Sequence, residues 1–165
     1  PRVARDTIVS VIDERSKQGE VLRSGIVAFE RETGELKYDM SGGLCVGSAA
    51  SLMVDDLLVA SGERGELVGI EIDDGSTRFR HVFAPQVADV PTSLQPVLRS
   101  GALFVPQNEV YVVRPRDGAV IGRVPTDLVP DRIRVDERCG VYVAELSGYV
   151  AAYHALPMLT LVSPT

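Results

Sequence analysis

The chain has 165 residues, of which 45% are hydrophobic and 24% charged, and its net charge is −6 at pH 7. This length suits one ordinary domain, and the aliphatic content excludes wholesale disorder. The negative charge argues against a general nucleic-acid binder or a polybasic membrane-surface protein, because no basic field attracts phosphates. No apolar run approaches the roughly 20 residues of a membrane-spanning helix. Two cysteines, Cys45 and Cys139, cannot form a disulfide framework, and we interpret both as small buried residues.

Short apolar runs rich in β-branched residues predict strands along the whole chain. The clearest runs are residues 7–12, 57–60, 102–105, 110–113 and 141–144. Several are apolar at consecutive positions, which is typical of strands buried on both faces. Residues 48–61 could instead form a helix with Met53, Leu57 and Ala60 on one face, but the repeats favour two strands broken at Asp55 and Asp56. The polar insertion at 14–22 is expected to be a long loop.

A repeat of about 40 residues organises the sequence. Gly34, Gly75 and Gly118 lie 41 and 43 residues apart, and each follows a strand-like segment at the same spacing. These preceding segments are 26–29, 67–70 and 110–113, and a further copy at 150–153 lacks the glycine. First strands are expected at 51–54, 95–98 and 132–135, and fourth strands at 36–38, 78–83, 119–124 and 159–162.

Four short strands per unit at this period are typical of one propeller blade. We therefore predict an all-β chain, a β-propeller of four-stranded antiparallel blades with about four blades in this chain. The expected blades form a single segment and span 1–41, 42–84, 85–125 and 126–165. Gly34, Gly75 and Gly118 are predicted to close the tight turns between third and fourth strands, where a positive φ favours glycine.

The first repeat, residues 25–38, resembles the pyrroloquinoline-quinone-type (PQQ-like) propeller repeat. That repeat typically reads small residue, hydrophobe, acidic residue or Asn, two spacers, Thr-Gly, three spacers and Trp. Ala28, Glu30, Thr33 and Gly34 match it, and Tyr38 stands where the Trp belongs.

The later copies match less fully. The second keeps Gly69, Glu71 and Gly75, with Phe79 at the aromatic position. The third keeps Asp117 and Gly118 but has Gly122 there, and the fourth keeps Ala152 and Tyr153. The resemblance implies that Tyr38 and Phe79 pack between blades, as the Trp does in the family.

The resemblance also bears on function. Quinoprotein dehydrogenases of the family carry a Trp under the quinone, a catalytic acid, a calcium site and in many members neighbouring cysteines. This chain has no Trp, and Cys45 and Cys139 are far apart. We therefore expect no catalytic residue, no metal and no cofactor, and a scaffolding or protein-binding role like that of the family's non-enzymatic members. Part of a quinone-dependent dehydrogenase, and a carbohydrate or small-ligand propeller, remain alternatives. The family resemblance and the excess of Arg over Lys indicate a bacterial protein of the cell envelope or periplasm, with the cytoplasm left open.

Other candidate chemistry is better explained by structure. Two acidic clusters, at 55–56 and 73–74, lack the alternating oxygens of a calcium loop, so we interpret them as turn residues. His81 and His154 have no partner at ligand spacing. Residues 43–47, Gly-Leu-Cys-Val-Gly, echo a nucleophile elbow, but no strand–turn–helix context is predicted, so we interpret them as a connection between blades.

Contacts with other proteins are expected at the proline-bearing connections between blades. The candidate residues are Pro85, Asp89, Pro91, Asp127 and Pro130. The alternating segments at 78–80 and 132–134 are expected on outer strands, either as solvated edges or as a protein-docking stripe.

Four blades would span about half of the seven or eight that the family usually has. The end blades are expected to expose apolar faces, built from Ile8, Val9, Val11 and Ile12 at one end and from Val141, Val143, Val150 and Leu161 at the other. The expected partners are further blades of the same polypeptide or a second copy, two sets of four making an eight-bladed ring. A protein partner is also expected, without nucleic acid or a membrane span.

Overall fold

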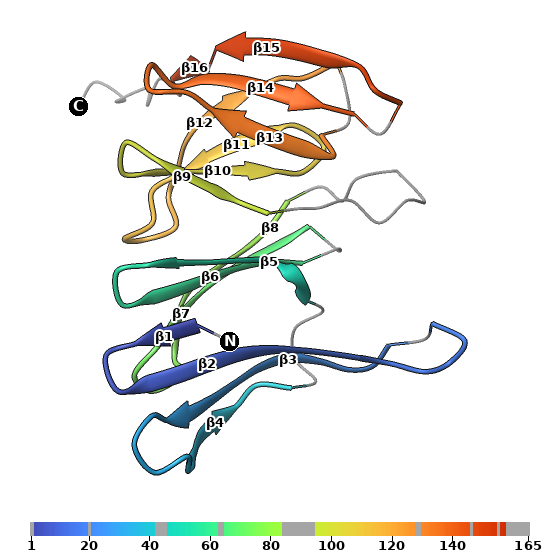
Figure 1. Cartoon of the computed structure of the whole chain (residues 1–165). Helices are drawn as coiled ribbons and strands as arrows, with labels where there is room; N and C mark the ends of the chain where they lie inside the picture. Colours follow the sequence, from blue (N-terminus) through green and yellow to red (C-terminus); the bar gives the residue numbers. More distant parts are fainter. Residues whose placement is uncertain are drawn as a thin grey trace, which may run out of the picture.

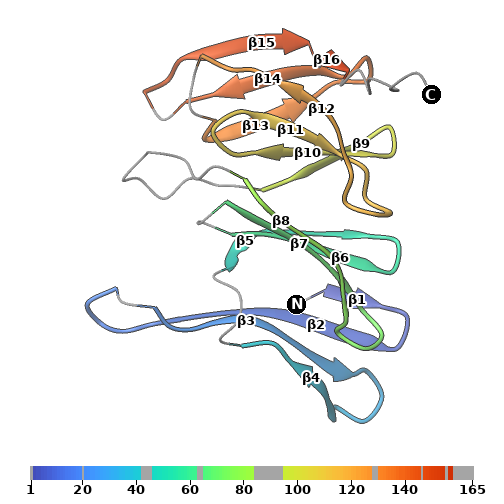
Figure 2. The same cartoon turned by 180° about the vertical axis from the view of Figure 1, so that it is seen from behind.

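A computed structural model describes residues 2–19, 21–41, 46–62, 65–83, 95–127, 130–145, 147–154 and 156–157. The described residues form sixteen β-strands and no helix, which confirms the all-β prediction. These strands build four antiparallel sheets stacked in chain order, as Figure 1 shows from one side and Figure 2 from behind. None of the described ranges contains a helix with the length and apolar character of a membrane span.

Apart from the short last strand, each sheet is a run of consecutive strands. Sheet 1 comprises β1 (Arg2–Ala4), β2 (Thr7–Arg15), β3 (Val21–Glu30) and β4 (Leu36–Asp39). Sheet 2 comprises β5 (Val46–Val54), β6 (Leu57–Gly62), β7 (Glu66–Glu71) and β8 (Thr77–Val82). Sheet 3 comprises β9 (Val97–Arg99), β10 (Ala102–Pro106), β11 (Val110–Val113) and β12 (Val120–Val124). The described part of sheet 4 comprises β13 (Arg132–Val135), β14 (Gly140–Ala144) and β15 (Val150–His154).

The last short strand joins an earlier sheet. β16 (Leu156–Pro157) pairs with β12 of sheet 3, at Gly122 and Arg123, so it crosses back from sheet 4. The expected fourth strand of that blade, at 159–162, lies outside the described residues.

Two sequence expectations are resolved by the hairpins. The two-strand interpretation of 48–61 is confirmed, since β5 and β6 are separated by Asp55 and Asp56 alone. The long loop expected at 14–22 is wrong. β2 and β3 pair as far as Arg15 and Val21, so the insertion lengthens a hairpin and leaves a short turn. Polar residues at its tip hid this pairing, because an exposed hairpin does not need an apolar face.

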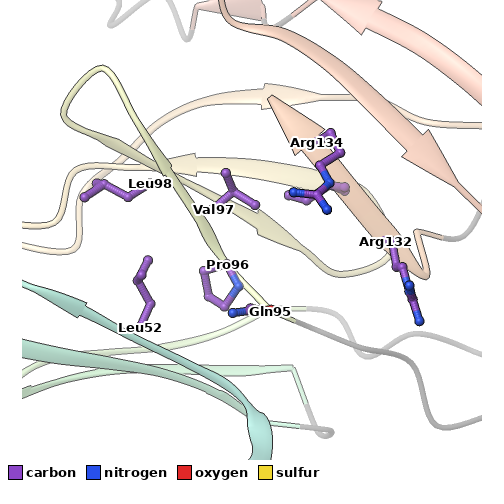
Figure 3. A pocket seen from close by; sticks show the side chains of 8 residues that line it. Leu52, Gln95, Pro96, Val97, Leu98, Arg132 and Arg134 are labelled. Carbon is purple, nitrogen blue, oxygen red and sulfur yellow. The ribbon is translucent and has the colours of Figure 1, made fainter. Parts of the chain in front are cut away.

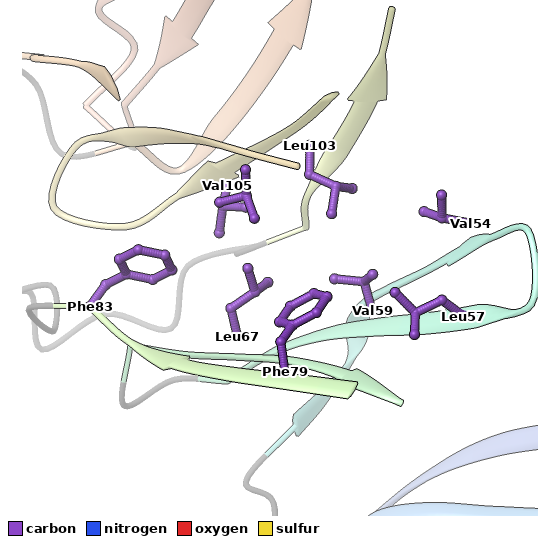
Figure 4. Close-up of a cluster of buried hydrophobic side chains, with 9 residues drawn as sticks. Val54, Leu57, Val59, Leu67, Phe79, Phe83, Leu103 and Val105 are labelled. Carbon is purple, nitrogen blue, oxygen red and sulfur yellow. The ribbon is translucent and has the colours of Figure 1, made fainter. Parts of the chain in front are cut away.

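The sheets pack face to face, and three apolar clusters fill the spaces between them. The second cluster lies between sheets 2 and 3 and contains Leu67, Phe79 and Leu103 (Figure 4). Both faces of an inner sheet are therefore covered, which explains why its strands are apolar at consecutive positions. We call the face of a sheet toward the preceding sheet its N-face, and the face toward the following sheet its C-face. In sheet 2, Leu58 lies on the N-face and Val59 on the C-face.

The first strands of sheets 3 and 4, β9 and β13, lie beside each other. The first strand expected at 132–135 is confirmed as β13, which forms an edge of the described part of sheet 4. Arg132 and Arg134 are exposed there and Ile133 is buried, as the alternation of the segment predicted. Arg78 and Arg80 do lie on β8, the fourth strand of sheet 2.

Candidate contact surfaces

The three repeat glycines occupy equivalent turns. Gly34, Gly75 and Gly118 lie between the third and fourth strands of sheets 1, 2 and 3, with φ of +73°, +76° and +72°. Each N–H donates to a backbone carbonyl four residues earlier, at 2.9 Å in all three turns. A positive φ is strained for other residues, so the backbone requires glycine at these turns.

An aromatic ring of the preceding sheet covers two of these glycines. A Cβ atom added to Gly75 would lie 2.7 Å from Cγ of Tyr38, on the fourth strand of sheet 1. A Cβ atom on Gly118 would overlap the ring of Phe79, on the fourth strand of sheet 2. At Gly34, in the first sheet, no atom of the described residues lies within 4 Å of that position. Tyr38 and Phe79 therefore lie between sheets, each over the turn of the next one.

The border between sheets 3 and 4 is built differently. Gly122 stands at the fourth-strand aromatic position of sheet 3 and carries no ring. Phe104 on β10 fills the space instead, only 2% exposed and packed with Val141 and Val143 of sheet 4. The aromatic residue at this border therefore lies on the second strand of its sheet, whereas at the other two borders it lies on the fourth. Sequence matching to the repeat could not find Phe104, because the repeat pattern covers only the third and fourth strands.

Ion pairs also cross two of the borders. Arg5, in the first turn of sheet 1, reaches Asp56 at 2.7 Å and Asp73 at 3.5 Å in sheet 2. Arg99 on β9 donates to the carbonyl of Asp136 in sheet 4 at 3.3 Å and lies 3.5 Å from Glu137. All these side chains are partly exposed, so each pair contributes at most about 1 kcal/mol.

Aspartates brace several turns by accepting backbone hydrogen bonds. The Ser76 N–H is the main cause of the lowered pKa of Asp74, and the Ala119 N–H is the main cause of the lowered pKa of Asp117. The pKa of Asp136 is lowered chiefly by the Gly140 N–H, which donates to Oδ1 at 2.8 Å. The turn interpretation of the acidic residues therefore has a direct structural basis at Asp74.

The expected contact loops are only partly visible. Pro85, Asp89 and Pro91 lie outside the described residues. Asp127 is exposed after β12, whereas Pro130 is buried just before β13. Both therefore precede the first strand of sheet 4.

A groove of about 540 Å³ lies where the chain enters the first strands of sheets 3 and 4 (Figure 3). Its lining side chains are Leu52, Gln95, Pro96, Val97, Leu98, Arg132, Ile133 and Arg134. The two arginines are exposed and the other polar group is an amide, so an apolar floor meets a cationic rim. In the sequence, the lining residues 95–98 and 132–134 come shortly after the two connections that were expected to be contact loops.

The free faces of the two end sheets differ from the expectation. Val9 and Val11 pack against sheet 2, and Val141 and Val143 are buried against sheet 3, so these four residues do not form the free faces. The free N-face of sheet 1 instead carries one apolar row across all four strands, Val3, Ile8, Phe29 and Leu36, paired in that order. The outer members, Val3 and Leu36, are 58% and 57% exposed.

The free C-face of sheet 4 is more mixed. Arg134, Tyr142 and Ala152 pair in one row, and Arg132, Ala144 and Val150 in the next. Tyr142 is 43% exposed and Val150 is 69% exposed. Val150 is thus the one residue of the expected C-terminal set that the structure leaves in solvent, while Leu161 lies outside the described residues.

Among the described residues, those considered for chemistry lie on different turns and strands. Asp55 and Asp56 form the turn between β5 and β6, and Cys45 is outside the described residues. His81 lies on β8 between the rings of Phe79 and Phe83, with centroids 6.0 and 5.8 Å away. Within the described ranges, no group of three or more His, Cys, Asp or Glu side chains is placed to hold a metal ion.

The arginines of β8 are engaged within their own sheet. Arg78 donates from Nη2 to Glu71 at 2.8 Å, and Arg80 pairs with Glu66, both acids lying on the neighbouring β7. These pairs favour the solvated-edge interpretation of this segment over a docking stripe.

Comparison with known proteins gives structural matches only. No protein-family model and no curated protein matches the sequence. The structure is similar to that of BamB from Moraxella catarrhalis, with a TM-score of 0.60 and 19% identity over 87% of this chain. It is also similar to a europium-containing methanol dehydrogenase, with a TM-score of 0.54 and 9% identity over 78% of this chain. A third match is the computationally designed Ika4 protein, with a TM-score of 0.54 and 15% identity over 80% of this chain.

These matches define the architecture. The chain has the fold of an all-β propeller and forms about four blades, as the repeats predicted. It spans 45% of the BamB chain and 24% of the dehydrogenase chain, but 83% of the designed chain. The chain therefore covers about half the length of the first of these proteins.

Proposed function

We propose that this chain is a non-catalytic propeller segment that acts through protein contact, as an assembly scaffold. The observation that carries this proposal is the apolar row Val3, Ile8, Phe29 and Leu36 on the free face of sheet 1. The corresponding faces of the three later sheets are buried in contacts with another sheet. An apolar face of this type on the surface is a feature of protein interaction sites.

The similarity to BamB supports the same proposal at the level of the fold, although a fold hosts many functions. We propose the blade limits 1–41, 42–84, 85–125 and 126–165, which are supported by the four described sheets, with only β16 crossing from the last range to sheet 3. Asp127, Pro130 and the neighbouring groove are proposed as a second contact region. The proposed partners are further propeller blades and another protein.

A quinone-dependent dehydrogenase is the main alternative, and it can be tested directly. The purified chain is mixed with pyrroloquinoline quinone, calcium and an electron-accepting dye, beside a quinoprotein dehydrogenase as positive control. We expect neither saturable quinone binding nor dye reduction with alcohol or sugar substrates. Dye reduction that depends on both quinone and calcium would contradict the proposed function.

The small-ligand alternative would use the groove at β9 and β13. Its described lining contains no aromatic ring on which a sugar could stack. No specific observation therefore favours a carbohydrate-binding function over protein contact.

A further inference from the structure

We infer that two copies of this chain close one ring, in which sheet 4 of each copy covers sheet 1 of the other. This inference rests on the proposed function and names the partner as a second copy. It follows from comparing equivalent rows of residues at the sheet borders inside the chain with the rows on the two free faces.

The free N-face of sheet 1 is equivalent to faces that are covered elsewhere in the chain. Its central pair, Ile8 and Phe29, corresponds to Leu58 and Ile70 in sheet 2. Leu58 and Ile70 are both 0% exposed, because sheet 1 covers them. In sheet 3 the corresponding pair, Leu103 and Val113, is also 0% exposed. Sheet 1 therefore presents the chemistry of a covered face, although no sheet of the described residues covers it.

The open turn at Gly34 gives the same indication. Gly34 has the backbone geometry of Gly75 and Gly118, which neighbouring rings cover, yet no described residue lies within 4 Å of its Cβ position. The turn and the apolar row lie on one sheet, so both mark the place of a preceding blade.

The free C-face of sheet 4 is equivalent to the C-face of sheet 3. Tyr142 lies on the second strand of its sheet, in the row with Arg134 and Ala152. Phe104 lies at the same point of sheet 3, in the row with Val97 and Val112. Phe104 is 2% exposed under sheet 4, whereas Tyr142 is 43% exposed. Tyr142 is therefore placed as the interface aromatic of a border that the described sheets do not complete.

The two free faces are the two halves of one such border. A copy offers Tyr142 at one end and Phe29 at the other, so a head-to-tail contact made twice satisfies both ends of both copies. Two such contacts related by a two-fold axis form a closed assembly. At the border between sheets 3 and 4, Gly122 leaves the fourth-strand position without a side chain, and Phe104 on the second strand packs there instead. One aromatic residue on the second strand is therefore sufficient to build such a border.

The first test is the mass of the wild-type chain in solution. One copy has a mass of 17.8 kDa. Sedimentation velocity from micromolar concentrations upward is expected to give a species of twice that mass. A single 17.8 kDa species up to 100 μM would overturn the inference and would favour further blades of the same polypeptide or of another protein. Quinone turnover plays no part in this measurement, so its failure is separate from failure of the proposed function.

Two variants then locate the contact. Phe29→Glu alters the free face of sheet 1, and Tyr142→Arg alters the free face of sheet 4. Each places an unpaired charge at both contacts of a homodimer, so each is expected to weaken association by roughly 100-fold. Val82→Glu is the matched control, because Val82 is 70% exposed on β8, away from both end faces. It should leave the dimer intact.

Mixing the two variants makes the test independent of folding defects. In the mixed dimer one contact keeps native Tyr142 and Phe29, and the other pairs the new arginine with the new glutamate. We expect the mixture to recover the doubled mass, which a misfolded variant could not do. Loss of the dimer in Phe29→Glu together with an intact dimer in Tyr142→Arg would contradict the head-to-tail contact, because that pattern indicates two copies of sheet 1 packed on each other. Failure of the mixture to associate would also overturn the inference.

Discussion

The ring of Tyr38, on the fourth strand of sheet 1, lies directly over Gly75, in the last turn of sheet 2. Gly75 combines a φ of +76° with a blocked Cβ position, whereas Gly34 has a φ of +73° and an open one. Substitutions at the two glycines can therefore be compared. At Gly34 a side chain strains only the backbone, whereas at Gly75 it must also displace the Tyr38 ring.

Alanine at Gly75 is expected to destabilise the fold more than alanine at Gly34. Both substitutions strain the backbone, at a cost of about 1 kcal/mol. Gly75→Ala must also displace the Tyr38 ring, which adds about 1–3 kcal/mol of overpacking. Urea unfolding of both variants measures the difference in the free energy of unfolding. Equal losses would show that Tyr38 does not rest on this turn in solution.

Removal of the Phe79 ring is expected to weaken the border between sheets 2 and 3. The ring is 8% exposed and crosses both Gly69 of its own sheet and Gly118 of the next. Phe79→Ala leaves a cavity there and should cost about 3–5 kcal/mol. Tyr149→Ala serves as control, since Tyr149 is 68% exposed. Similar unfolding midpoints for the two variants would contradict the packing of Phe79.

Tyr38 also predicts a dependence on alkaline pH. Burial, and then the charges of Asp74 and Asp73, raises its pKa to about 12. The folded state therefore binds the phenol proton more tightly than the unfolded state does. The resulting contribution to the free energy of unfolding is full below the unfolded pKa of about 10 and is lost as the pH rises through 12. Tyr38→Phe should remove that loss.

The same variant should not weaken the fold at pH 7. Within the described part of the chain, the buried Tyr38 hydroxyl has no hydrogen-bond partner, so removing it leaves no group unpaired. Unfolding measured from pH 7 to pH 11, with Tyr149→Phe as control, tests both statements. A marked destabilisation by Tyr38→Phe at pH 7 would mean that the hydroxyl is bonded.

Asp136 predicts a dependence on acid pH of the opposite sign. Its Oδ1 accepts hydrogen bonds from the N–H groups of Arg138 and Gly140, both at 2.8 Å. These bonds lower its pKa in the folded state, so its contribution is full above the unfolded pKa of about 4 and is lost as the pH falls below it.

Asp136→Asn should therefore be less stable than wild type at pH 7, and the gap should close toward pH 2. Unfolding by urea at several pH values measures it, and Asp127→Asn, at an exposed position, is the control. A gap that stays constant with pH would show that the charge of Asp136 is not involved.

The repeats predicted much of the fold because their signals are local. Spacing of the glycines marked the third-to-fourth-strand turns, where Gly34, Gly75 and Gly118 share one geometry. Tyr38 and Phe79 stand four residues after Gly34 and Gly75. This spacing predicted their position, because the turn and the short fourth strand follow each other directly.

The free faces could not be predicted in the same way. Residues 7–12 are largely apolar on both faces, so alternation did not tell that Val9 points into the core while Ile8 points outward. Only the pairing register, which aligns Ile8 with Phe29 and Val3, separates the two faces. Phe104 and Tyr142 were missed because they are recognised only by their equivalent positions in two rows of paired strands. No spacing in the sequence indicates that equivalence.

A crystal structure of the wild-type chain tests the central claim most directly, since the claim concerns which residues cover the end sheets. The account predicts a ring of eight sheets with two-fold symmetry, in which Phe29 of each copy lies against the sheet that carries Tyr142 of the other. A structure in which Phe29 and Tyr142 both face solvent, or in which sheet 1 packs on a second sheet 1, would contradict it.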